Sequence, residues 1–237
     1  MTQTKEELDQ KQHEMEEMVK VGVHLGHKKN KKHPKMEPYL YGLRNDISII
    51  DVEKTYEKLE EALSFIKSLI SQDKVVMVIG TKVQLKEMVT EFAKEVDIPY
   101  MTERWLGGTF TNFGNIKKRV DHLKDLEKKK EEGDLEKYTK KERLNITREI
   151  ESLKVKFEGL KSLSKLPDAV LVMDIEKDGL AVKEASERGI KVIAISDSNV
   201  NPEVVDYPIP ANDDAVSSVR YILEKIKGII IESRVVR

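Results

Sequence analysis

The hydrophobic positions of this chain follow two alternating patterns. Short runs rich in β-branched residues, at 75–79, 167–174 and 191–196, have the length and composition of buried strands. Between such runs, over 52–70 and 83–96, apolar residues recur every three or four positions, which is typical of amphipathic helices. Regular alternation of strand and helix predicts an α/β fold: a doubly wound, mostly parallel sheet of the flavodoxin or Rossmann kind. Further strands are predicted at 47–51, 99–102 and 205–210, and further helices at 5–20 and after Asn212-Asp-Asp214.

The β pattern stops after residue 104 and resumes near residue 166. Between these points apolar residues first follow a helical spacing, which ends at a turn at Gly133-Asp134. A Thr139–Glu142 capping box then opens a returning helix. The two apolar stripes are Ile116, Val120, Leu123 and Leu126, and then Ile146, Ile150, Leu153, Phe157 and Leu160. Stripes of this spacing are what two helices need to bury one seam each, so 115–163 is predicted to be an antiparallel coiled-coil hairpin.

The chain is therefore divided into three parts. Residues 1–20 form an N-terminal surface helix, 21–114 and 164–237 form one α/β body, and 115–163 form the inserted hairpin.

Composition narrows the class of protein. Charged residues make up 36% of the 237 residues, which is above the usual share of about 25%, although the net charge is only −1. The absence of cysteine excludes a disulfide framework and a thiolate metal site. No apolar run approaches a membrane span, and the acidic N-terminus argues against a signal peptide, so we expect a soluble cytoplasmic protein.

Local charge is more informative than net charge. Residues 27–35 contain five lysines, two histidines and no acid, and the neighbouring glycines and Pro34 exclude a regular helix. A flexible loop with this density of like charge favours phosphate binding, although a merely solvated loop is the alternative. His24, His27 and His33 lack the helical spacing of a zinc site, so no metal is expected.

One hypothesis for the function is an α/β enzyme that binds a phosphate or nucleotide. Asp174 and Asp197 follow predicted strands, where such folds place catalytic groups, and the glycines at 80 and 107–108 could cradle a phosphate. Against it, neither acid is paired with a nucleophile, and neither the Rossmann nor the P-loop motif is present. Aspartate at a strand end also commonly begins a turn or caps the next helix.

The other hypothesis is a nucleic-acid-binding scaffold. Lysines concentrate in the loop and on the hairpin, where 104–163 carries 16 Lys or Arg against 11 Asp or Glu. Arg104, Trp105, Phe110 and Phe113 surround a glycine pair and offer a cation and ring faces of the kind that RNA recognition uses. For Trp105 we favour packing at the junction between hairpin and body.

Several stretches resemble one family in order and spacing, from about Met18 to Ile226. They are Gly22-Val-His-Leu-Gly-His27, Asn30 to Lys35, Asn45 to Thr55, Arg104-Trp-Leu-Gly-Gly108, Leu166-Pro-Asp-Ala-Val170, Val192 to Asn199 and Ile209 to Asp214. The family is ribosomal protein S-two of the small subunit, and the hairpin makes the chain similar to its bacterial type.

The resemblance implies a structural role without catalysis or cofactor. It implies binding to rRNA at the junction of head and body, late assembly, support of translation initiation, and protein S-three, possibly also S-one, as neighbours. The rRNA contacts that it implies by position are the basic loop and the neighbourhood of Arg104, and the hairpin would add its own. The candidate residues are Lys28, Lys29, Lys31, Lys32, Lys35, Arg44, Arg104, Lys117, Lys118, Arg119, Lys140, Lys141 and Arg143.

Three departures from the family pattern are visible. The segment before Met18 is longer and more acidic than usual, and the chain ends soon after the last helix, which together put S-one docking in doubt. The loop 28–32 is richer in lysine than its aromatic-containing counterparts, so stronger phosphate contact and less stacking are expected in that loop.

Overall fold

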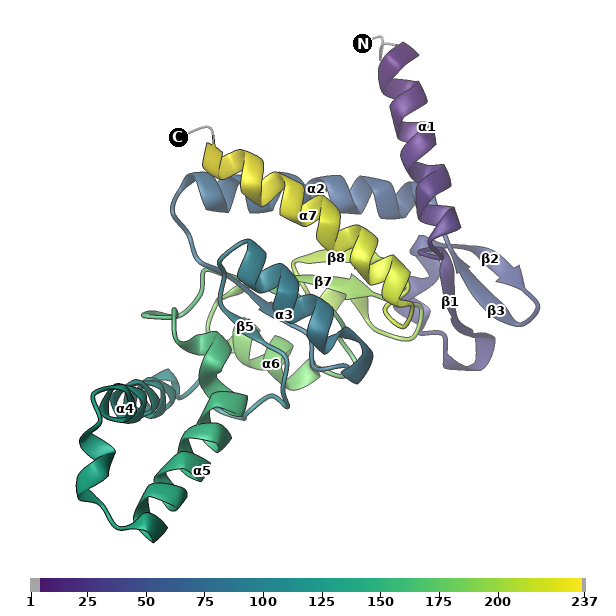
Figure 1. Ribbon diagram of the computed structural model, residues 1–237. Helices are drawn as coiled ribbons and strands as arrows, with labels where there is room; N and C mark the ends of the chain where they lie inside the picture. The colour runs from purple at the N-terminus through teal and green to yellow at the C-terminus, as the bar shows by residue number, and fades with distance from the viewer. Residues whose placement is uncertain (1–4, 236–237) are drawn as a thin grey trace.

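The computed structural model describes residues 5–235, and it is a mixed α/β structure built on a five-stranded sheet (Figure 1). All strand pairs in this sheet are parallel, and the spatial order is β5-β4-β6-β7-β8. The strands are β4 (Val76–Ile79), β5 (Tyr100–Met101), β6 (Ala169–Val172), β7 (Lys191–Ser196) and β8 (Tyr207–Pro210). The predicted strands at 75–79, 99–102, 167–174, 191–196 and 205–210 are thus confirmed, each within a few residues at its ends.

Helices cover both faces of this sheet. One face packs against α2 (Val52–Ser71), α3 (Lys86–Glu95) and α7 (Val216–Val235), and the other against α6 (Gly179–Glu187) and the root of the inserted hairpin. Successive residues of each central strand enter different cores: Leu171 faces the first, and Val170 and Val172 face the second. This is the period-two alternation of a strand that is buried on both sides.

A second, antiparallel sheet precedes the first along the chain. Its order is β1-β3-β2, with β1 (Leu25–Lys28), β2 (Leu40–Arg44) and β3 (Ile47–Ile50). The strand expected at 47–51 therefore belongs to this sheet and not to the parallel one. The description of 27–35 as a flexible loop is also wrong in part, because Lys28 ends β1 and two short 3₁₀ helices follow, η1 (Lys29–Lys31) and η2 (Pro34–Tyr39).

The inserted segment is a pair of helices, α4 (Phe113–Glu131) and α5 (Lys140–Phe157). Gly133 adopts a positive φ of 76° at the turn, a 3₁₀ helix η4 (Asp134–Lys137) follows, and Thr139 and Glu142 form the predicted capping box. The four predicted apolar residues of α4 are buried, as are Ile150 and Phe157 of α5.

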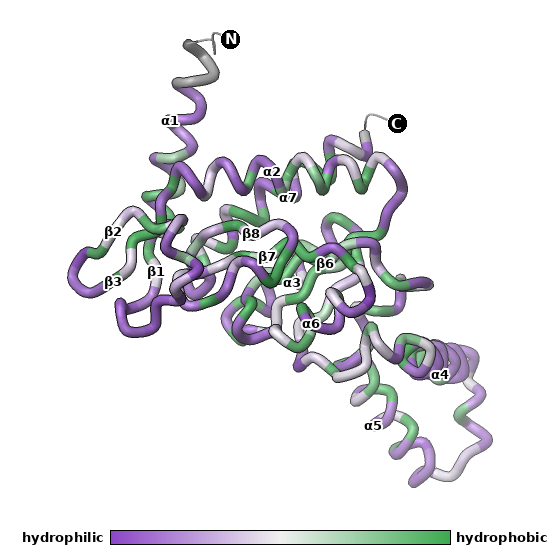
Figure 2. The backbone as a smooth tube through the Cα atoms, turned by 180° about the vertical axis from the view of Figure 1, so that it is seen from behind, coloured by the Kyte–Doolittle hydropathy of each residue, from purple (hydrophilic) through white to green (hydrophobic). Residues whose placement is uncertain are grey.

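The two helices are not aligned along their length. Figures 1 and 2 show α4 nearly along its axis and α5 from the side. The ion pairs agree: His122 meets Glu149 at 3.1 Å and Glu127 meets Lys154 at 2.9 Å, so residues later in α4 meet residues later in α5. In an aligned antiparallel pair the order would be reversed. The helices therefore cross, and Leu144 and Val155 stay exposed.

Besides the short 3₁₀ helices η3 (Val83–Leu85) and η6 (Pro202–Val204), two further helices belong to the described chain. The first is α1 (Lys5–Lys20), which Figure 1 shows projecting from the body and whose Met18 is buried in the first core. The second is η5 (Glu158–Leu160), which returns the chain from α5 to the edge strand β5. Gly159 lies so close to Tyr100 that a Cβ would collide with its backbone oxygen. Over the described residues, no helix has the length and apolarity that crossing a membrane requires.

Candidate nucleic-acid interface

The lysines at 28–32 are held by the antiparallel sheet. Lys28 closes β1, and the backbone N–H of Lys29 donates to the carbonyl of Asp46 in the β2–β3 turn at 2.8 Å. Arg44 lies across β3 from Lys28, because both residues are opposite Ile47. The structure thus brings Arg44 to the basic loop, a proximity that the linear sequence does not show.

The five loop lysines differ in their partners. Lys32 pairs with Glu37, and Lys35 pairs with Glu203 at 2.9 Å. Lys28, Lys29 and Lys31 are exposed and form no ion pair within the part of the chain that the structure describes. Lys28 and Lys29 are therefore free to meet an external anion, Lys31 lies near enough to Asp214 for its charge to help lower the pKa of that carboxyl, and Lys32 and Lys35 are partly neutralised.

The loop is tied to the carboxyl edge of the parallel sheet through Ser198. The hydroxyl of Ser198 accepts a hydrogen bond from the backbone N–H of His27 at 2.7 Å, and its carbonyl accepts one from His33 N–H at 2.8 Å. A Cβ at Gly26 would lie 2.7 Å from Ser198 Oγ, so only glycine allows this approach. These contacts between distant segments fix the loop against the body.

His27 adds a charged contact to the same edge. Its Nδ1 lies 3.2 Å from Asp197 and its Nε2 3.3 Å from Asp214. The hydrogen bond to Asp197 outweighs the burial of the ring, which opposes it, and the carboxylates of Asp197, Asp214 and Asp213 add to it, so the pKa of His27 is raised. The two carboxylates therefore favour a protonated imidazole that joins β1 to the ends of β7 and β8.

The strand order reverses between β4 and β6, the place where α/β proteins bind their ligands. At this place Lys82, which follows β4, forms ion pairs with carboxylates that follow β6 and β8. Its Nζ lies 2.8 Å from Asp174 and 2.7 Å from each of Asp213 and Asp214. Burial alone would lower the pKa of Lys82, but these hydrogen bonds outweigh it and raise it.

The carboxylates of the enzyme hypothesis are both occupied within the protein. Asp174 binds Lys82 and accepts from the N–H of Lys177 at 2.8 Å, and Asp197 accepts from Ser198 N–H and from its hydroxyl at 3.0 Å. The carboxylates at this edge of the sheet lie close together. Burial and the charges of Asp174 and Asp197 raise the pKa of Asp213 to about 7. The strand-end acids serve as turn and ion-pair partners, the structural alternative considered above.

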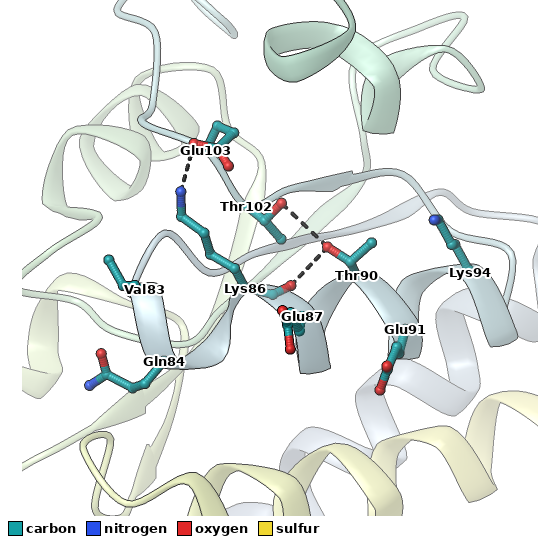
Figure 3. Close-up of a pocket in the computed structure, with 9 residues that line it drawn as sticks. All are labelled: Val83, Gln84, Lys86, Glu87, Thr90, Glu91, Lys94, Thr102 and Glu103. Carbon is teal, nitrogen blue, oxygen red and sulfur yellow. Dashed lines mark hydrogen bonds and ion pairs between the residues drawn. The ribbon is translucent and has the colours of Figure 1, made fainter.

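A second hollow lies on α3 beside the edge strand β5 (Figure 3). Its polar groups also bind one another: Lys86 meets Glu103 at 2.6 Å, and the hydroxyls of Thr90 and Thr102 lie 3.4 Å apart. Two lysines, 86 and 94, and three glutamates, 87, 91 and 103, line it, so charges of both signs are present (Figure 3).

The segment that connects β5 to α4 is organised around one buried carboxylate, Glu184 of α6. Its Oε1 accepts from the backbone N–H of Gly108 at 2.8 Å, and its Oε2 accepts from Phe110 N–H at 3.0 Å and Thr111 N–H at 3.1 Å. It also accepts from Trp105 Nε1 at 3.3 Å. Burial would raise the pKa of Glu184, but these hydrogen bonds outweigh it and the pKa is lowered.

Trp105 packs inside the protein. It is 7% exposed and meets the buried ring of Phe110 edge-on, with centroids 4.8 Å apart. The expected packing role at the hairpin junction is therefore confirmed, and neither ring is free to stack on a base. Arg104 is exposed beside them.

The remaining candidate cations are exposed but widely separated. Lys117, Lys118 and Arg119 lie at the body end of α4, and Lys117 Nζ donates to the carbonyl of Ser164 at 3.1 Å. Lys140, Lys141 and Arg143 lie at the start of α5, which Figure 1 shows at the far end of the arm. Arg104 follows β5, at the edge of the sheet farthest from the loop side. The candidate residues outside the loop thus lie in separate places. Arg44 is the one among them that lies close to the basic loop.

Sequence reasoning missed Lys82 and Glu184 as organising residues. Each binds partners more than 70 residues away along the chain, and neither lies in a local motif. Lys82 does follow a predicted strand and Gly80, but that position suggested a phosphate site and not an internal ion pair.

The fold and these contacts define the class of protein. It is an α/β protein whose strand-end carboxylates form internal contacts and whose exposed lysines lie at the end of β1 and in η1, beside a small second sheet. The family model described as "Ribosomal protein S2" matches residues 18–233. Three similar proteins are each named "Small ribosomal subunit protein uS2": those of Dictyoglomus thermophilum (43% identical, 94% of this chain, 91% of the relative), Roseiflexus sp. (43%, 93% and 84%) and Coprothermobacter proteolyticus (42%, 93% and 82%). The chain belongs to the ribosomal protein S2 family. It is a protein of the small ribosomal subunit, and its relatives are structural ribosomal proteins, not enzymes.

Proposed function

We propose that this chain binds small-subunit rRNA through the basic loop and Arg44. The observation that carries this proposal is the set of three exposed lysines, 28, 29 and 31, which form no ion pair within residues 5–235 and follow a segment held by a buried anchor. Preorganised cations lose little entropy on meeting phosphates, and their binding releases counterions from the RNA. Lys32, Lys35 and Arg104, with Lys117, Lys118, Arg119, Lys140, Lys141 and Arg143 of the arm, add secondary contacts.

The test compares two triple variants of equal charge. Lys28→Ala, Lys29→Ala and Lys31→Ala together should weaken binding to protein-free small-subunit rRNA on the order of ten-fold and reduce the slope of log K against log salt by about 2 to 3. The control replaces Lys67, Lys94 and Lys183, three exposed helical lysines that also form no ion pair within residues 5–235. Equal slopes for the two variants would refute the proposal.

A position in the ribosome is part of the same proposal, and it rests on the resemblance set out in the sequence analysis. We place the chain at the junction of head and body, joining late in assembly and supporting initiation, beside protein S-three and possibly S-one. Co-sedimentation with small subunits, and cross-linking from α1 (Lys5–Lys20) and from the arm, test these neighbours. A chain that stays at the top of the gradient would contradict the placement.

Two finer structural assignments also belong here. In the parallel sheet β5 lies on one side of β4, and β6, β7 and β8 lie on the other side. This order supports a doubly wound, flavodoxin-like body. For the arm, we propose that α4 and α5 align as an antiparallel coiled coil when bound in the subunit, supported by the seam spacing and by the seam residues Ile146 and Leu153, which are only partly buried in the crossed arrangement. Distance measurements between spin labels on the two helices, free and in the subunit, test this alignment.

A further inference from the structure

Tyr41 is the most exposed of the large hydrophobic and aromatic side chains in the described region, at 82%. It lies in β2, the edge strand of the antiparallel sheet, which Figure 1 shows projecting from the body. A large ring in water forgoes the stabilisation that burial would give it. Nothing in the folding of the body accounts for its position, because neither core includes it.

The backbone at Tyr41 is irregular in a way that presents the ring. Leu40 is opposite Ile50, and Gly42 is opposite Ile49, so two steps along β2 match one step along β3. Tyr41 is thus the extra residue of a β-bulge, a device that redirects a side chain relative to the regular pleat. The next residue, Gly42, has open space where a side chain would lie, which leaves the ring accessible.

The charges around the ring select the kind of partner. Residues 28–46 carry six Lys or Arg and two acids. Arg44 lies on the same strand as Tyr41, about 10 Å further along at the usual rise per residue, and Lys28 lies across β3 from Arg44. A basic protein surface would be repelled here. The hollow of Figure 3 provides the contrast, since Val83 is 80% exposed there among charges of both signs.

We propose that Tyr41 is a stacking platform for an unpaired base of rRNA, placed beside the cations that hold the phosphates. This proposal rests on the proposed rRNA binding and adds a residue that contributes affinity without charge. Single-stranded and looped RNA is recognised through aromatic faces combined with basic groups. The two imidazoles of the loop are engaged within the protein, His27 by Asp197 and Asp214 and His33 by the N–H of Lys35. Trp105 and Phe110 are buried, so the exposed ring nearest to the loop in the chain's fold is sought on the neighbouring strand.

The test uses the full chain, protein-free small-subunit rRNA and three substitutions. Tyr41→Ala should weaken binding about 5- to 150-fold, the range that corresponds to the stacking of one base, with an unchanged salt slope because tyrosine carries no charge. Tyr41→Phe should bind like the unchanged protein, and Tyr41→Leu, which keeps an apolar side chain but no ring, should resemble Tyr41→Ala. All three should retain the unfolding midpoint, because the side chain is exposed.

The outcomes separate this inference from the proposed function. If the lysine variant loses affinity and Tyr41→Ala does not, stacking is refuted and rRNA binding stands. If neither variant changes rRNA binding, both proposals fall. If Tyr41→Ala binds rRNA normally but is depleted from purified subunits, the ring contacts a protein and the stacking role is wrong. Equal loss in Tyr41→Phe and Tyr41→Ala would also overturn it.

Discussion

The basic loop and the helical arm both carry many lysines, but they hold them differently. In the arm, Glu127 lies 2.9 Å from Lys154 and 2.8 Å from Lys161, and burial, which would raise the pKa of Glu127, is outweighed by these lysines, which lower it. In the loop, Lys28 and Lys29 have no such partner within residues 5–235, and Lys31 forms no ion pair there but helps lower the pKa of Asp214. Carboxylates thus neutralise some lysines of the arm, whereas others, such as Lys118 and Lys140, are exposed and form no ion pair within residues 5–235. In both regions the number of unpaired charges is a better guide to anion binding than the total number.

The two regions also differ in how they join the body. The loop is fixed through His27 and Ser198 to the end of β7, close to its charges. The arm is fixed at its root, by the hydrogen bonds to Glu184 and by η5 on β5, and its far end projects away from the rest of the described residues (Figure 1). Each of these two differences can be tested by a separate experiment.

Two deletions of different length should have very different effects on the body. Removing 115–163 with a short glycine bridge also removes Leu160 and Leu163, both buried in the second core, and uncovers the edge of β5. We expect this deletion to lower the free energy of unfolding by roughly 4 kcal/mol or more. Removing only 121–153 keeps η5 and Leu163 but takes Leu123, Leu126 and Ile150 from the same core, so it should cost clearly less than the longer deletion, on the order of 1 to 2 kcal/mol.

Urea unfolding followed by circular dichroism measures both deletions, and the shorter one serves as the control for the longer. If the shorter deletion also abolishes cooperative unfolding, the arm is part of the body and not an attachment to it. Comparison of the two deletions shows whether the arm ends at residue 163, as the sequence predicts, or before η5.

Glu184→Gln should destabilise the root of the arm. The amide brings an N–H₂ group toward backbone N–H donors that now share a carboxylate, so several buried donors lose their acceptor. We expect a loss of about 2 to 4 kcal/mol. Because the folded pKa is lowered, the contribution of Glu184 is present above the unfolded pKa and is lost as pH falls through the folded pKa.

The single tryptophan makes this effect easy to follow, since Trp105 itself donates to Glu184. Its fluorescence should shift to the red in Glu184→Gln before global unfolding. Glu187→Gln, an exposed change on the same helix, is the matched control. Equal stability of the two variants would show that the carboxylate is not the organising group.

The elements that were predicted from the sequence are those whose signals are local. The capping box at Thr139, the turn at Gly133 and the parallel strands each lie within a few residues of the features that define them. β1 and β2 were missed because each is short and contains a glycine, which has low strand preference, and only pairing with β3 makes these segments extended. Tertiary pairing overrode local preference in both.

The same distinction between local signals and tertiary contacts applies to the candidate interface. Charge density identified the basic loop, but it could not distinguish Lys32 from Lys31, because the partner Glu37 is selected by the turn between them. The crossing of α4 and α5 was equally invisible, since the seam spacing is compatible with several crossing angles. Tyr41 had no sequence signal at all, because its exposure depends on a bulge between two strands.

The smallest expected effect concerns the proton on His27. Its folded pKa is raised, so its contribution to stability is fully present below the unfolded pKa, about 6.5, and is lost as pH rises through the folded pKa. Asp213, with its pKa raised to about 7, acts in the same direction over a lower range, from about 4 to 7. The free energy of unfolding should therefore decline between pH 6 and pH 8.5, by on the order of 1 kcal/mol for the histidine contribution.

His27→Gln should remove the part of this decline above pH 6.5 and keep the part below it, because Asp213 is unchanged. His13→Gln, on the exposed face of α1, is the matched control and should leave the whole profile unchanged. The rRNA affinity of the unchanged protein should decline over the same pH range, since the proton holds β1, which carries Lys28, against Asp197 and Asp214. If His27→Gln retains the full decline, the loop is held by Ser198 alone, and the anchor that distinguishes the loop from the arm is made of neutral hydrogen bonds.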